Sequence, residues 1–341
     1  MSRTHISSSH DVNRGNNQVQ EYHGLINQGA TSYLNSVLQV LFMTEEFREA
    51  VKRCQNKYKR GIDPQLQTLF KNLTKRTAET TEVTTRLHIK NVNEQHDPAE
   101  YFERILTKTS DKASQIFKGQ LTYRTVCQCG KKTPKDSPFW NLPLPMTDET
   151  YTIEHGIQEF FTDSEFSGEN QLYCKSCQSK RNATVQCEVK HHPEVLMLLL
   201  KRFEFNYHHM SYVKNCSAVD VSLTITIPEN QRYELYALVE HFGSLKGGHY
   251  TATIKPLDED RWYEFNDSSV TLLSNQKYEL PRLQKSQSAY LLFYKKKNSG
   301  TQDEREESAM AGLPLNNNIT AECQNVNRNE REALYDHSNE E

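Results

Sequence analysis

Ser32 is the residue in the N-terminal part of the chain whose side chain is best placed to take part in a reaction. It follows a Gly-rich stretch, residues 24–30, and precedes apolar residues at helical spacing: Leu34, Val37, Leu38, Leu41 and Phe42. The first N–H groups of a helix are unpaired, and with the helix dipole they favour a developing anion. Ser32 is therefore a candidate nucleophile. The alternative is that Thr31 or Ser32 only caps the helix, since Ser and Thr are preferred caps.

Four of the eight cysteines form two close pairs separated by a long insert: Cys127 with Cys129, and Cys174 with Cys177. Four thiolates supplied by two turns are the ligand set of a zinc ribbon, so structural zinc is predicted. The second pair has the usual two-residue spacer, whereas the single residue between Cys127 and Cys129 strains the usual turn around the metal. The alternative is four ordinary cysteines.

A helix start is predicted in the middle of the stretch NVNEQHDPAEYFERIL, which covers residues 91–106. Asp97 is the expected N-cap, Pro98 occupies the first helical position, and Glu100 follows three residues after the cap. On this interpretation alone, Asp97 has a structural role.

Three segments together resemble one enzyme family. The string GLINQGATSYLNSVLQVL resembles the cysteine box of the ubiquitin-specific proteases, with Ser32 where the family has Cys. GGHY and WYEFNDSS, which follow about 215 residues later, resemble the histidine box of the same family. The resemblance implies that His249 is the general base and that Asn266 orients its imidazole, with Asp267 as the second candidate. It also implies that Asn27 supplies an oxyanion-hole amide.

The resemblance covers roughly residues 22–297 and implies an α+β, papain-like fold. We expect a helical thumb, a β-rich palm and zinc-ribbon fingers at about residues 117–200. Gln95, Asp97 and Glu100 match a family segment that lines the groove for the C-terminal tail of ubiquitin. Because that tail is basic, Asp97 could pair with one of its arginines through charge-assisted bonds. Ubiquitin and ubiquitinated proteins are the implied partners.

The family cleaves the isopeptide bond after the terminal glycine of ubiquitin by thiolate attack. A thiol near a helix N-terminus and an imidazole ionises far more readily than a serine hydroxyl. With Ser32 in this position, we expect hydrolysis to be weak or absent. Ser32 is either a natural loss of the nucleophile or a Cys-to-Ser substitution that traps complexes. A non-enzymatic ubiquitin-binding module and a true serine hydrolase are the alternative functions.

Further elements follow from apolar periodicity. Pro64 begins a second predicted helix with Leu66, Leu69, Phe70 and Leu73 on one face. Residues 117–202 change to short alternating runs that predict β structure. Buried or alternating strands are predicted at residues 196–203, 233–242 and 288–294, the first of them resembling the Leu-Lys-Arg-Phe palm strand of the family.

Composition indicates a soluble globular protein of 341 residues, 35% hydrophobic and 25% charged. No apolar run is long enough to span a bilayer, and the polar N-terminus does not resemble a secretory signal. We therefore expect a cytoplasmic or nuclear monomer with free thiols or metal ligands rather than disulfides, and no membrane partner.

Both ends of the chain have little apolar periodicity. Residues 1–21 and 298–341 are predicted to be disordered. The second of these carries ten Asp or Glu against three Arg, so the net charge of −3 leaves about +4 for the remainder. Nothing in the remainder forms a concentrated basic stripe, which argues against nucleic acid as the main partner.

Overall fold

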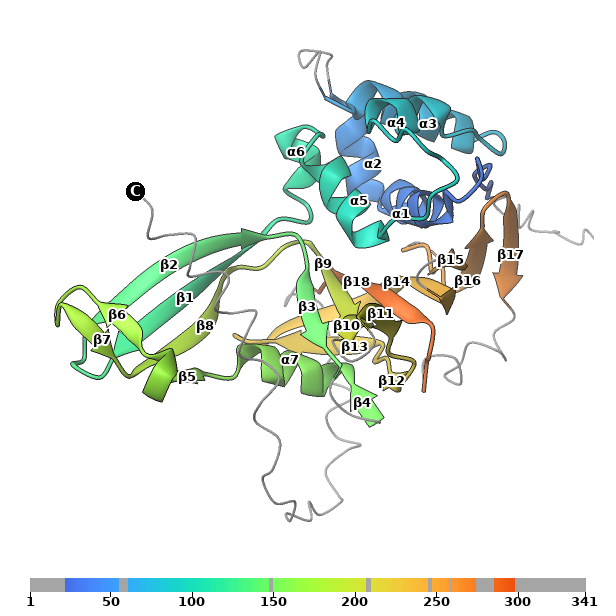
Figure 1. Cartoon of the computed structure of the whole chain (residues 1–341). Helices are drawn as coiled ribbons and strands as arrows, with labels where there is room; N and C mark the ends of the chain where they lie inside the picture. The colour runs from blue at the N-terminus through green and yellow to red at the C-terminus, as the bar shows by residue number, and fades with distance from the viewer. Residues whose placement is uncertain are drawn as a thin grey trace, which may run out of the picture.

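The computed structural model describes residues 22–54, 61–146, 150–206, 210–244, 247–257, 259–273 and 285–297. The predicted disordered segments, residues 1–21 and 298–341, lie outside the described residues. Within the described part, a group of helices packs on a large central sheet, and a second sheet extends away from it, to the left in Figure 1. No helix in these residues is long and apolar enough to cross a membrane.

The helical part, the thumb, contains α1 (Ser32–Met43), α2 (Glu45–Lys52), α3 (Asp63–Leu73), α4 (Thr81–Arg86), α5 (Pro98–Leu106) and α6 (Asp111–Ser114). Both helices predicted from apolar spacing are confirmed as α1 and α3, and Pro64 lies in the first turn of α3. All residues of α1, polar ones included, are buried, so this helix lies inside the domain rather than on its surface.

The palm is an eight-stranded sheet with the order β17-β16-β15-β14-β18-β9-β3, and β13 also pairs with β14. Its strands are β3 (Leu142–Pro145), β9 (Val195–Lys201), β13 (Thr224–Ile227), β14 (Gln231–Ser244), β15 (Gly247–Ile254), β16 (Trp262–Asn266), β17 (Ser269–Leu273) and β18 (Ala289–Lys296). The three predicted strands are confirmed as β9, β14 and β18. Only β3 and β9 pair in parallel, and the other pairs are antiparallel.

Both faces of the palm are covered, which explains the unbroken apolar run in β9. Val195 and Met197 face the core that the sheet shares with the helices, whereas Leu196 and Leu198 face a second core on the opposite side. A strand buried on both faces needs apolar residues at every position rather than at alternate ones. Helix α7 (Ile153–Phe161) contributes Ile153 and Ile157 to that second core.

Helix α7 interrupts the region that the sequence predicted as β structure. Thr152 caps it by accepting a hydrogen bond from the backbone N–H of His155, and the two buried isoleucines are four residues apart, as on one helix face. Two small strand pairs accompany it: β4 (Thr150–Thr152) with β12 (Ala218–Asp220), and β10 (Phe203–Asn206) with β11 (Ser211–Lys214).

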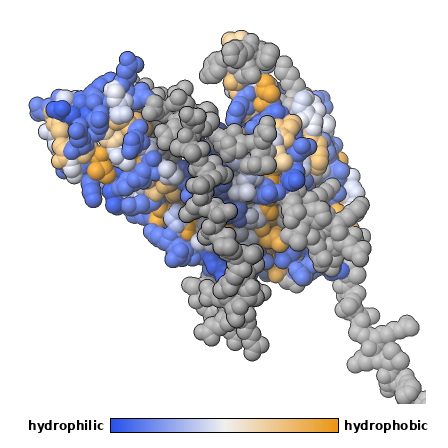
Figure 2. All heavy atoms as spheres, turned by 90° about the horizontal axis from the view of Figure 1, so that it is seen from below, coloured by the Kyte–Doolittle hydropathy of each residue, from blue (hydrophilic) through white to orange (hydrophobic). Residues whose placement is uncertain are grey.

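The fingers are a four-stranded antiparallel sheet with the order β2-β1-β8-β5. Its strands are β1 (Gly119–Cys127), β2 (Lys132–Phe139), β5 (Ser164–Phe166) and β8 (Ala183–His191). A turn of 3-10 helix, Gly168–Asn170, leads to the hairpin of β6 (Leu172–Cys174) and β7 (Ser179–Arg181) at the tip. Hydrophilic residues cover most of the visible surface of the fingers in Figure 2. Alternate residues of β8, among them Val185, Cys187 and Val189, are buried, so one face of this sheet is covered.

Arg202 follows β9 and connects the end of this strand to two other chain segments by hydrogen bonds. Its side chain is fully buried and donates to four backbone carbonyls, those of Asn215, Ser217, Ser286 and Ala289. A guanidinium has five donors in a fixed planar fork, so it can join several chain segments where no regular ladder does. The arginine of the Leu-Lys-Arg-Phe strand is thus a structural residue.

Candidate functional site

Ser32 is the first residue of α1, and its side chain lies in the interface between this helix and β15. The residue is 3% exposed. Thr31 occupies the N-cap position, but its side chain makes no cap hydrogen bond to the helix. Instead, the Thr31 hydroxyl accepts from the Gln28 backbone N–H at 3.0 Å and donates to Asn27 Oδ1 at 3.2 Å, so it holds the preceding loop together.

His249 lies on β15 and faces the turn between β16 and β17. Its Nε2 is 2.8 Å from Asn266 Oδ1 and 4.0 Å from Asp267 Oδ2. Because an amide oxygen only accepts, this contact assigns the proton of a neutral imidazole to Nε2 and leaves Nδ1 as the basic nitrogen. The side chain is 40% exposed, so it is accessible to a substrate.

The hydroxyl of Ser32 is engaged by the backbone beside His249. The N–H of Tyr250 donates to Ser32 Oγ at 3.2 Å. No direct hydrogen bond joins Ser32 to the His249 side chain, although the structure describes both residues. Since Ser32 Oγ accepts from an N–H group that cannot take a proton, the contact positions the hydroxyl without activating it.

Asp267 connects the turn that carries Asn266 to the start of α1. Its Oδ2 accepts from Asn27 Nδ2 at 2.9 Å, and its Oδ1 accepts from Asn35 Nδ2 at 2.8 Å. Its backbone carbonyl accepts from the Leu25 N–H at 2.8 Å. Gly24 is required beside this turn because an added Cβ would lie 2.2 Å from the Asp267 carbonyl oxygen.

All five residues predicted from the two boxes therefore lie in one place: Asn27, Ser32, His249, Asn266 and Asp267. Asn35 belongs to the same network and was not predicted. Asn35 lies within the segment that resembles the cysteine box, but its hydrogen-bond partner Asp267 is 232 residues away, so no local signal identified it.

The amide of Asn27 is held at both ends. Its Oδ1 accepts from the N–H groups of Gly29 and Thr31, and its Nδ2 donates one hydrogen to Asp267. A carboxamide nitrogen carries two hydrogens, so the second N–H of Nδ2 has no acceptor among the residues that the structure describes.

The residues predicted to line a tail groove have three different environments. Asp97 caps α5, because its Oδ1 accepts from the Ala99 N–H at 2.7 Å, and its Oδ2 accepts from the Tyr290 hydroxyl at 2.7 Å. The predicted helix start is thus confirmed. Glu100 is exposed and pairs with Arg104 on the same helix at 3.3 Å. Gln95 Oε1 accepts from the Gly248 backbone N–H at 3.1 Å.

Comparison with known proteins agrees with this arrangement. The family model described as ubiquitin carboxyl-terminal hydrolase matches residues 23–294, which is most of the chain. The chain belongs to this family. Ubiquitin carboxyl-terminal hydrolase 47 of Drosophila melanogaster is 27% identical over 80% of the chain and 25% of the relative. Ubiquitin carboxyl-terminal hydrolase 48 of Danio rerio is 30% identical over 79% of the chain and 29% of the relative.

The chain spans about a quarter of the length of these relatives. The matched region contains the helices, the palm and the fingers, so the resemblance to the ubiquitin-specific proteases is confirmed for the fold. The domain is a ubiquitin-specific protease domain with mixed α+β architecture.

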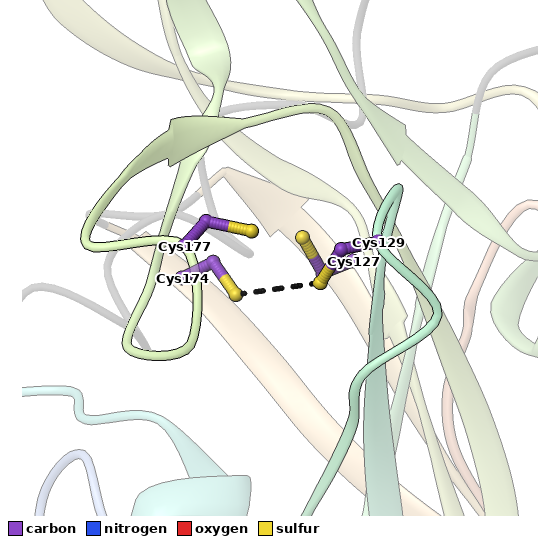
Figure 3. Close-up of side chains that lie close together, drawn as sticks. All are labelled: Cys127, Cys129, Cys174 and Cys177. Atoms are coloured by element: carbon purple, nitrogen blue, oxygen red, sulfur yellow. Dashed lines mark hydrogen bonds between the residues drawn. The ribbon is translucent and has the colours of Figure 1, made fainter.

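The four paired cysteines of this hydrolase domain meet at the tip of the fingers. Figure 3 shows Cys127 and Cys129 facing Cys174 and Cys177 from the opposite turn. All four sulfur atoms lie within 4.8 Å of one another, and Cys129 Sγ is 3.9 Å from Cys174 Sγ. Tetrahedral zinc with Zn–S bonds of about 2.3 Å requires sulfur separations of about 3.8 Å. The donor set and its spacing therefore fit zinc.

The one-residue spacer of the first pair does not separate its sulfurs from the others. Gly130, directly after Cys129, has a φ of 82°, which lets the chain turn back immediately. In the second turn, the backbone N–H of Cys177 contributes most to stabilising the Cys174 thiolate. The Cys127 thiol and the Ser176 N–H contribute less, and together these contacts lower the pKa of Cys174 to about 7. Backbone N–H groups directed at sulfur favour the deprotonated form that a metal binds.

His241 lies on β14 directly behind the site. It is fully buried, its ring packs on Tyr250 and Phe203, and neither ring nitrogen has a hydrogen-bond partner among the described residues. Burial, followed by the nearby charges of Lys214, Arg202 and His249, lowers its pKa to about 4. His241 is therefore neutral at pH 7, and its titration opposes folding in acid.

The stability of the domain should depend on pH through His241. A His pKa of about 4 in the folded state and about 6.5 in the unfolded state means that the unfolded chain binds more protons between these values. This contribution is complete above pH 6.5 and is lost as pH falls. His241→Gln should therefore reduce the decrease in unfolding free energy between pH 7 and pH 5 by about 2 kcal/mol, measured by urea unfolding.

The matched control is His191→Gln, at an exposed position at the end of β8. It should retain the pH dependence of the parent. An unchanged pH dependence in His241→Gln would show that this imidazole does not carry the effect.

Proposed function

We propose that this domain binds ubiquitin in the manner of a ubiquitin-specific protease and that its own hydrolysis is weak or absent because Ser32 occupies the nucleophile position. The observation that carries the proposal is the placement of Ser32. It begins α1 next to β15, where the adjacent His249 is oriented by Asn266, but its hydroxyl bonds to the Tyr250 N–H rather than to the imidazole.

A cysteine at position 32 would find the parts of a thiol protease around it. Its thiolate would attack the carbonyl carbon of the bond after the terminal glycine of ubiquitin. His249 would carry the proton on Nδ1 and pass it to the leaving amine, while Asn266 holds Nε2. The free N–H of Asn27 would stabilise the oxyanion, a contribution of about 10²–10³ in rate for one donor.

Serine changes the first step of this sequence. A hydroxyl is not ionised near neutral pH, so His249 would have to remove its proton during the attack. That step requires an O–H···N contact, and the Ser32–His249 pair has none in this structure. Of the three candidate functions, a serine hydrolase therefore has less support than a catalytically impaired protease or a non-enzymatic ubiquitin-binding domain.

Ubiquitin and ubiquitinated proteins are the proposed partners, and the cytoplasm or nucleus is the proposed location. A monomer is the proposed state of the domain. Ser32→Cys tests the chemistry of the site whether Ser32 is natural or was introduced to trap complexes.

Replacing Ser32 by cysteine should restore hydrolysis. We expect little or no turnover of a ubiquitin C-terminal fluorogenic substrate by the parent and clear turnover by Ser32→Cys. Adding His249→Ala to Ser32→Cys should lower the restored rate by about 10²–10⁴-fold, the range for general acid–base catalysis.

Appreciable turnover by the parent, lost on Ser32→Ala, would instead favour the serine hydrolase. An inactive Ser32→Cys protein that still binds ubiquitin would favour the binding module.

Asp97 is proposed to bind the basic ubiquitin tail in addition to capping α5. Its two oxygens each accept one bond in the free protein, and a carboxylate has room for further donors. Asp97 is exposed at the fixed end of α5, so an arginine of the tail can reach this carboxylate.

Asp97→Asn separates the two roles of this residue. Asn caps a helix as well as Asp, and the Tyr290 hydroxyl, which donates to Asp97, can instead accept from the Asn amide, so the melting temperature should change little. Loss of a hydrogen bond to a charged group should weaken ubiquitin binding by about 1.5–3 kcal/mol, measured by calorimetric titration. Equal ubiquitin affinity in the parent and the variant would leave Asp97 as a cap only.

Zinc is proposed as a structural component of the fingers, held by Cys127, Cys129, Cys174 and Cys177. The bound metal would join the turn after β1 to the β6–β7 hairpin, with no part in the reaction. Purified protein should contain about one zinc per chain by elemental analysis.

Cys174→Ser should lose this zinc and lower the melting temperature. The control Cys216→Ser alters an exposed thiol outside the cluster and should retain both. Parent protein without zinc, melting at the same temperature as Cys174→Ser, would contradict the assignment.

A further inference from the structure

Strand β15 has an open edge at the residues that surround His249. On one side it pairs with β14 along its whole length, down to Gly247. On the other side, its pairing with β16 begins only at Ala252. The backbone groups of residues 248–251 on that second edge therefore have no strand partner in the described part of the chain. Buried or half-buried backbone donors in such a position need other acceptors.

Two side chains of the thumb take the place of the missing strand. The Gly248 N–H donates to Gln95 Oε1 at 3.1 Å, and the Tyr250 N–H donates to Ser32 Oγ at 3.2 Å. Residues 248 and 250 point their N–H groups to the same edge, since the period of a strand is two. His249 is thus held between two contacts that come from separate thumb elements.

The same stretch is confined from the β14 side. A Cβ built on Gly248 would lie 2.0 Å from His241 Nε2 and 2.8 Å from the Phe242 carbonyl oxygen. Only glycine fits at this position, and the buried ring of His241 limits movement of the backbone toward β14. Gln95 limits movement in the opposite direction.

We propose that Gln95 is a positioning residue for His249 rather than a contact for the ubiquitin tail. The inference rests on the proposed function and concerns the same site. The oxygen of Gln95 accepts from the residue immediately before His249, so it fixes the point from which the imidazole extends toward Asn266. Its loss leaves the Gly248 N–H without that acceptor and lets the strand move.

The first experiment uses the parent protein and needs no catalytic activity. Gln95→Leu removes the acceptor at similar size, and amide hydrogen exchange of Gly248, followed by NMR, should become about tenfold faster, as expected for the loss of one hydrogen bond. Gln95→Glu keeps an acceptor and should keep the protection. Gln158→Leu, at an exposed position on α7, is the control for the chemical change.

Ubiquitin affinity and kinetics distinguish positioning from tail binding. The dissociation constant of ubiquitin should stay within about twofold in Gln95→Leu, because binding is not the affected step. In the Ser32→Cys protein, Gln95→Leu should lower kcat about tenfold with KM nearly unchanged, the pattern of an interaction that acts on the chemical step.

Unchanged Gly248 exchange in Gln95→Leu overturns the inference. If ubiquitin binding is weakened at the same time, Gln95 is a contact for the ubiquitin tail instead. The two proposals fail separately. An inactive Ser32→Cys protein counts against the proposed catalytic group, whereas Gly248 exchange in the parent still decides the role of Gln95.

Discussion

The carboxylate of Asp267 is the interaction on which the site geometry depends. It accepts one amide hydrogen from Asn27 and one from Asn35, so it joins the loop before α1, the helix itself and the turn after β16. The turn is more than 230 residues from the other two segments in the chain. These two donors satisfy both carboxylate oxygens, and His249 Nε2 lies 4.0 Å from Oδ2. The turn that carries Asn266, and with it the orientation of His249, is fixed to the helix that carries Ser32.

The thumb and the palm meet through polar contacts laid over an apolar core. Leu34, Val37 and Leu38 of α1 are fully buried and pack in the same core as residues of β15 and β16. Apolar packing stabilises the contact but has no direction, whereas hydrogen bonds require particular distances and angles. The relative placement of the side chains around His249 therefore comes from the contacts of Asp267, Gln95 and Ser32, and the stability of the interface comes mainly from α1.

Much of this architecture follows from local sequence. Apolar spacing predicted α1 and α3, the Asp-Pro pair predicted the start of α5, and the two box motifs predicted which residues meet around His249. Helix α7 was missed because its two isoleucines lie within a region of short alternating runs. Asn35 and the Gly248 contact of Gln95 were missed for a different reason. Their partners are distant in sequence, and a single amide side chain carries no information about which backbone group it will meet.

An intact set of catalytic neighbours is weak evidence for catalysis in this chain. Asn27 holds the loop before α1, Asp267 holds Asn27 and Asn35, and Gln95 satisfies an open strand edge. Each of these residues has a structural task that continues without a nucleophile, because removing it would leave half-buried polar groups unpaired. Ser32 itself satisfies the Tyr250 N–H, for which an oxygen is a better acceptor than a thiol sulfur. A chain that has lost the thiol can therefore keep the rest of the site for reasons of folding alone, and only the nucleophile position reports on the reaction.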